Sequence, residues 1–137
     1  MSPYAITTMF IAVIGAVAEV GLSIATTSAT PPPLGLVAMM MVFLVGPLAF
    51  LALLAWRRRT HPRRSHVLLL ATMLIAAAGI GVLGVDYFYS RTQPIRRILD
   101  SNPAMLPTLQ WVAAVAVWLI LVIVERREKR AAASGKK

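Results

Sequence analysis

The stretch YAITTMFIAVIGAVAEVGLSIAT, residues 4–26, decides the fold, because it is long, almost wholly apolar and interrupted by a single charge, Glu19. A helix needs about 20 apolar residues to cross the hydrocarbon core of a bilayer. Three further stretches reach this length, at residues 34–56, 67–89 and 105–124. Together they predict an all-α integral membrane protein, in which the whole chain forms one domain, an antiparallel four-helix bundle.

The composition agrees with membrane insertion. Hydrophobic residues make up 58% of the 137 residues and charged residues 14%, whereas a soluble domain averages about 25% charged residues. A soluble helical bundle is the alternative, but each of its helices needs a polar face, and 34–56 and 105–124 have almost no polar residues. A cleaved signal peptide is the alternative for the first span. Thr27-Ser28-Ala29 resembles a cleavage site, but the segment before the apolar run has no Lys or Arg.

Basic residues indicate the orientation. Eleven of the fourteen Lys and Arg residues lie in RRRTHPRRSH at 57–66 and in the tail ERREKRAAASGKK at 125–137. Because cytoplasmic segments carry an excess of Lys and Arg, we expect both termini, the 57–66 loop and the basic tail to be cytoplasmic. These charges directly flank apolar runs, so we expect membrane lipids as partners and no nucleic acid.

Glu19 lies on a helical face of small and polar residues. At helical spacing that face contains Thr8, Ala12, Gly15, Glu19, Ser23 and Thr26, and the opposite side carries Phe10, Val13, Val17 and Leu22. Small residues let helices approach closely, so we expect Glu19 to point toward other helices or a wet cavity. We expect the large side chains of the opposite side to face lipid. A charged side chain near the bilayer centre costs roughly 2.5–3.5 kcal/mol or more. We therefore expect Glu19 to be protonated, paired or hydrated.

Glu19, Ser23 and Asp86 form the candidate site for a ligand or a proton. Both carboxyl groups belong to the outer half of the membrane, where the candidate charge partners are Arg91, Arg96 and Arg97. Intramembrane ionisable residues are functional by default expectation. A purely structural role also stays open for each: helix packing for Glu19 and an interfacial position for Asp86.

Two small-residue features concern helix packing. Ala77 and Gly81, four residues apart, predict a close helix contact. Gly46-Pro47, at the centre of the second span, removes a backbone hydrogen bond and can kink that helix.

Groups for catalysis and metal binding are scarce. The chain has no Cys, which excludes disulfides and thiolate chemistry. Both histidines, His61 and His66, lie in the 57–66 loop, too far from Glu19 or Asp86 for a catalytic triad. No phosphate-binding glycine loop or HExxH sequence occurs. We therefore expect no metal and no cofactor, and the sequence favours a protein that is not an enzyme.

Two segments resemble known families. PYAI…AEVG, from Pro3 to Gly21, resembles the first helix of small multidrug resistance transporters, which implies that Glu19 binds cations. The segment from Leu51 to Leu99 is similar in layout to the anthrone oxygenase-like family of small four-helix membrane proteins. Pro94 and Ile95 match that family's segment after helix three, and Arg96 stands in place of its Asn. The second resemblance implies a membrane-bound, cofactor-free oxygenase.

Two functions follow as expectations. The first is a non-enzymatic membrane protein that binds or moves a small cation or lipophilic ligand, or that acts as an accessory subunit, with itself or a larger membrane complex as partner. The alternative is a membrane-bound oxygenase-like biosynthetic enzyme, as the second resemblance implies.

Overall fold

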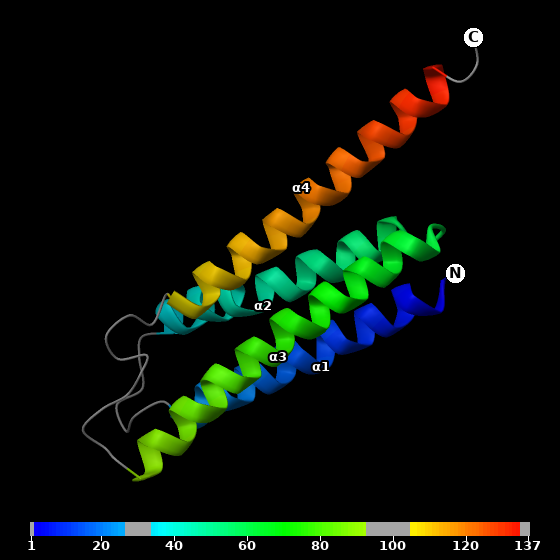
Figure 1. The fold of residues 1–137 in the computed structure, drawn as a ribbon. Coiled ribbons are helices and arrows are strands. Elements are labelled where there is room, and N and C mark those ends of the chain that lie inside the picture. The colour runs from blue at the N-terminus through cyan, green and yellow to red at the C-terminus, as the bar shows by residue number, and fades with distance from the viewer. Residues whose placement is uncertain (1, 27–33, 93–104, 135–137) are drawn as a thin grey trace.

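The computed structural model describes residues 2–26, 34–92 and 105–134, and within them the chain forms four α-helices (Figure 1). The helices are α1 (Pro3–Thr26), α2 (Leu34–Arg57), α3 (Pro62–Thr92) and α4 (Met105–Ser134). Each contains one of the long apolar runs, because a helix satisfies its backbone hydrogen bonds within the segment. The predicted all-α class is therefore confirmed.

Two helices extend beyond the apolar runs that predicted them. α3 begins at Pro62, because a proline in the first helical turn loses no hydrogen bond and has a suitable φ. α4 continues to Ser134, because the Glu, Arg, Lys and Ala residues of 125–134 are strong helix formers. The 57–66 segment is therefore helical except at 58–61.

Three helices are long and apolar enough to cross a membrane: Pro3–Ala25 in α1, Pro62–Tyr89 in α3 and Met105–Ala133 in α4. The corresponding segment of α2 is shorter among the described residues, Met41–Arg57, although α2 itself has 24 residues. Large apolar side chains on these helices point outward, among them Leu74, which is 72% exposed. Such surfaces suit contact with lipid.

In the described residues, α2 and α3 lie between α1 and α4. Both α2 and α3 contact α1, and α4 contacts α2 and α3. Within the described residues, the backbones of α1 and α4 do not come close, so these two helices occupy opposite corners of the arrangement. Gly15 allows α1 to approach α3, because a Cβ there would lie only 2.9 Å from the Cβ of Ala76. Figure 1 shows α4 diverging from the other helices toward its C-terminal end.

Buried apolar side chains form two clusters along the helix axes. The large cluster contains Ala12, Leu48, Leu51, Leu54, Ala55, Leu68, Ile75, Ala76, Ala114 and Leu121. The small cluster contains Leu44, Leu83 and Leu106, against which Val20, Leu22 and Val82 pack. Residues from all four helices form each cluster or pack against it. The core is therefore divided into two apolar layers with a gap between them.

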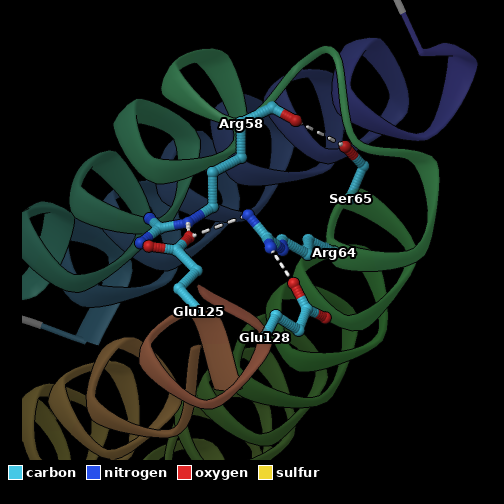
Figure 2. Close-up of polar contacts among 5 residues, drawn as sticks. All are labelled: Arg58, Arg64, Ser65, Glu125 and Glu128. Carbon is cyan, nitrogen blue, oxygen red and sulfur yellow. Dashed lines mark hydrogen bonds and ion pairs between the residues drawn. The ribbon is translucent and has the colours of Figure 1, made fainter. Parts of the chain in front are cut away.

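Ion pairs join the connection between α2 and α3 to α4 (Figure 2). Arg58 Nε donates a hydrogen bond of 2.6 Å to Glu125 Oε1. Arg64 donates to the same oxygen at 3.3 Å and also to Glu128 Oε2. The hydroxyl of Ser65, which is fully buried, donates to the carbonyl oxygen of Arg58 at 3.3 Å. These contacts hold the start of the charged part of α4 against the 58–65 segment.

The Glu125 interactions predict a pH dependence of stability. The Arg58 guanidinium, hydrogen-bonded to Glu125, lowers the pKa of that carboxyl from its ordinary value of 4.5, with help from the charges of Arg64 and Lys129. Ionised Glu125 therefore contributes stability that is complete above the ordinary pKa and is lost as the pH falls through the lowered pKa of the folded state. Because the pair is partly exposed, we expect at most about 1 kcal/mol.

Thermal unfolding of the full chain in detergent micelles checks this expectation. Glu125→Gln should lower the Tm by a few degrees at neutral pH, and its difference from the wild type should shrink below about pH 4. Glu128→Gln is the matched control, because Glu128 is 58% exposed and pairs only with Arg64 among the described residues. It should have the smaller effect. A Glu125→Gln difference that is the same at neutral and acidic pH contradicts a role for the ionised carboxylate.

Candidate functional site

The small and polar face of α1 points into the structure. Its buried members are Thr8, Ala12, Gly15 and Glu19. Ser23 is half-buried, and the side chain of Thr26 lies outside the described part of the chain. Glu19 has none of its surface exposed, so its carboxyl group is enclosed by other helices, as the sequence predicts.

The opposite side of α1 is largely exposed. Phe10, Val13 and Val17 are all more exposed than buried, in agreement with the predicted lipid-facing side. The prediction is wrong for Leu22, which is half-buried and packs against the small cluster. The reason is that the small cluster lies at the level of Leu22 and fills the space beside α1.

Glu19 is hydrogen-bonded to Gln110 of α4. Gln110 Nε2 donates to Glu19 Oε1 at 2.8 Å, and Gln110 is 4% exposed. Because the backbones of α1 and α4 do not come close, the two side chains meet across the interior. On α4, Gln110 lies one turn from Leu106 of the small cluster and one turn from Ala114 of the large cluster. The pair therefore forms a polar layer in the gap between the two apolar clusters.

Gly79 of α3 provides the space for this pair. A Cβ at Gly79 would collide with Glu19 Oε1 and Gln110 Nε2. The predicted close contact at Ala77 and Gly81 is wrong, because α3 turns the face of Gly79 toward the interior. Ala77 and Gly81 are both exposed, and a Cβ at Gly81 would have nothing within 4 Å.

Two oxygens of the pair have no partner. Among the described residues, neither Glu19 Oε2 nor Gln110 Oε1 is hydrogen-bonded, although both atoms are buried. An unsatisfied buried polar atom costs about 1–3 kcal/mol. A carboxylate offers only acceptors, whereas a neutral carboxylic acid also has an O–H donor. A proton on Glu19 Oε2 would therefore give Gln110 Oε1 the kind of donor that it lacks.

Asp86 does not join this pair. It is buried, at 3% exposed, but it follows Gly79 by seven residues on α3, which places it about 10 Å farther along the helix axis. Leu83 of the small cluster lies between them on the same face. Asp86 and Glu19 are thus two separate buried carboxyl groups.

Of the candidate charge partners, Arg91 is the one that falls within the described residues. Arg91 is exposed in the last turn of α3, and its guanidinium carbon lies 5.2 Å from the centre of the Tyr87 ring. Arg96 and Arg97 lie outside the described residues. The described part of the structure therefore gives Glu19 an uncharged partner, the Gln110 amide.

Sequence reasoning missed Gln110 as the partner of Glu19. The signal was the predicted depth in the membrane. Glu19 lies about 6 Å from the centre of 4–26, and Gln110 about 7 Å from the centre of 105–124, both toward the predicted outer side. Matching polar residues by depth would have found the pair.

The two histidines lie outside this site. His61 and His66 are exposed, and the His66 ring lies 5.1 Å from that of Tyr4, near the start of α1. Within the described ranges, no three or more His, Asp or Glu residues are grouped so that they could hold a metal ion. The chemistry available at the Glu19–Gln110 pair is hydrogen bonding, proton exchange and attraction of a cation.

The space at Gly79 can be tested by adding one methyl group. Gly79→Ala should lower the free energy of unfolding by about 1–3 kcal/mol, because the Cβ forces the Glu19–Gln110 pair apart. Gly81→Ala is the matched control on the same helix and should be neutral or slightly stabilising, because alanine favours helix and the site is open. Equilibrium unfolding in mixed micelles measures both. Equal effects of the two substitutions would show that Gly79 has no special role.

Comparisons with protein families, characterised proteins and solved structures find no match to this chain, so the two family resemblances remain predictions from sequence.

Proposed function

We propose that the chain is an integral membrane protein, an antiparallel bundle of four spanning helices with both termini on the cytoplasmic side. The exposed apolar faces of the helices support insertion. The backbone N–H of Ser2 donates to the carbonyl oxygen of Arg59 at 2.9 Å, and Glu125 pairs with Arg58. The start of α1, the α2–α3 connection and the basic part of α4 therefore share one end. An excess of positive charge there supports a cytoplasmic position.

We propose that the function resides in the Glu19–Gln110 pair, which binds a proton in exchange for a small or lipophilic cation. The observation that carries this proposal is a fully buried carboxyl group whose described partner is an uncharged amide. A structural ion pair would have supplied a basic side chain. An intramembrane carboxyl group without one is typical of sites that take up protons or cations.

A proton and a cation would stabilise the Glu19–Gln110 pair in different ways. With a proton on Oε2, the Glu19 acid and the Gln110 amide can form two reciprocal hydrogen bonds, so that all their polar atoms are used. Without the proton, the buried carboxylate of Glu19 costs free energy unless a bound cation takes the place of the proton. Glu19 thus acts as the exchange site, Gln110 orients its carboxyl group, and Gly79 leaves room for both.

An apolar groove supports a lipophilic ligand. It has a volume of about 270 Å³ and lies between α1 and α3, lined by apolar side chains and by Gly15. Gly15 is one turn before Glu19, and Ile80, also in the lining, is next to Gly79. A cation with an apolar body would find its apolar contacts here, whereas a hydrated ion would not.

Liposomes that contain the full chain and a trapped pH-sensitive dye test this function, with tetraphenylphosphonium as the probe. If the cation enters in exchange for protons, the internal pH should rise when the probe is added outside. Glu19→Gln should reduce the response to that of protein-free liposomes, because it keeps the shape of the neutral acid and removes the exchangeable proton.

Asp86→Asn is the matched control, because it removes the other buried carboxyl group of the described residues and leaves the Glu19–Gln110 pair in place. It should retain most of the response. The unfolding midpoint of each variant verifies that it folds. A folded Glu19→Gln variant that is as active as the wild type contradicts the proposed role of the carboxyl group. A wild-type response no greater than that of empty liposomes contradicts cation exchange altogether.

A further inference from the structure

The end of the protein that holds the α2–α3 connection is strongly basic. Among the described residues, nine Lys and Arg side chains and two acids lie between 57 and 64 and between 125 and 130. The positive-inside rule accounts for the side of the membrane on which these residues lie. It does not account for how they are arranged around the ion pairs.

The two acids are directed toward the connection. Glu125 and Glu128 are three residues apart and so lie on one face of α4, where they bind Arg58 and Arg64 (Figure 2). The charge of Lys129 also contributes to the lowered pKa of Glu125. Both acids are therefore already used within the protein.

The remaining arginines form an exposed surface, here named the basic surface. It consists of Arg57, Arg59, Arg63, Arg126, Arg127 and Arg130, all exposed. No acid of the described residues forms an ion pair with any of them. The basic surface has one part on the α2–α3 connection and one part on α4. The ion-pair network holds both parts at the same end of the protein.

Aromatic residues lie at the level of the basic surface. Trp56 is 50% exposed, and the Arg59 guanidinium carbon lies 5.3 Å from the centre of its ring. Tyr4 is 41% exposed at the start of α1. Exposed Trp and Tyr side chains mark the interface between the hydrocarbon core and water. With the proposed insertion, the part of the basic surface beside Trp56 lies at the depth of the lipid headgroups.

We propose that the basic surface binds the phosphate groups of anionic phospholipids. Arginine suits this partner because its planar guanidinium can donate two hydrogen bonds to one phosphate. Clusters of basic residues beside a spanning helix attract anionic lipids, and the depth of Trp56 and Tyr4 favours a lipid over a nucleic acid. This inference rests on the proposed membrane insertion and is independent of the Glu19 site.

The ion pairs limit the strength of this binding. Glu125 and Glu128 neutralise two arginines that would otherwise face the same phosphates. Removing both acids should therefore add Arg58 and Arg64 to the basic surface and increase the preference for anionic lipid. An arrangement that served only to orient the chain would show no such response.

The full chain in nanodiscs that mix phosphatidylcholine and phosphatidylglycerol tests the proposal, with mass spectrometry of the lipids that stay bound. The wild type should be enriched in phosphatidylglycerol. The triple variants R57Q/R59Q/R63Q and R126Q/R127Q/R130Q should each reduce the enrichment at least about tenfold, because each removes three basic residues that attract the anionic surface. The double variant E125Q/E128Q should raise it. The charge-matched control R91Q/R96Q/R97Q, on the predicted outer side, should leave it unchanged.

Several results would overturn the proposal. An inserted wild type without a preference for phosphatidylglycerol, or a control variant that loses as much enrichment as the others, rules out the basic surface. Displacement of the bound lipid by millimolar inorganic phosphate assigns the surface to a free anion, and displacement by a DNA duplex assigns it to nucleic acid. A chain that leaves the bilayer on alkaline extraction overturns this proposal together with membrane insertion, which distinguishes the two failures.

Discussion

The hydrogen bond from Gln110 to Glu19 is the interaction on which the rest of the structure depends. It joins α1 and α4, whose backbones do not approach each other among the described residues. Among the described residues, the backbone of α4 comes close only to α2 and α3. Since apolar packing tolerates rotation and sliding better than a buried polar pair does, this bond fixes how α4 is turned and how deep it lies relative to α1.

The hydrogen bond also matters because it lies between the two apolar clusters of the core. A polar layer in a core is stable only when its groups are satisfied, and a half-satisfied layer is worse than an apolar one. Two oxygens, Glu19 Oε2 and Gln110 Oε1, have no hydrogen-bond partner among the described residues. They leave this layer half satisfied unless a proton or cation completes it. In the proposed function, the same feature that specifies the packing also makes the site responsive to a ligand. A basic end at the headgroup level would hold the layer at a fixed depth in the membrane.

Much of the fold could be predicted from the sequence because the signals were local. Run length located the four helices, and helical spacing placed Glu19 on a buried face. The helical extensions at Pro62 and through 125–134 were not predicted. An apolar run ends where charged residues begin, but a helix can continue through charged residues that have a high helix propensity. Gln110 and Gly79 could not be assigned from local pattern. Their roles depend on which faces of α3 and α4 turn inward, and spacing alone favoured Gly81, which is exposed.

A double-mutant cycle between Glu19 and Gln110 tests the central claim most directly, with the free energy of unfolding measured in mixed micelles. Glu19→Leu and Gln110→Leu should each destabilise the protein by about 1–3 kcal/mol, because each leaves the partner buried and unsatisfied. The double variant, which removes both polar groups, should be markedly more stable than the sum of the two losses predicts. Strictly additive losses would contradict the account, because they would mean that the two side chains do not depend on each other.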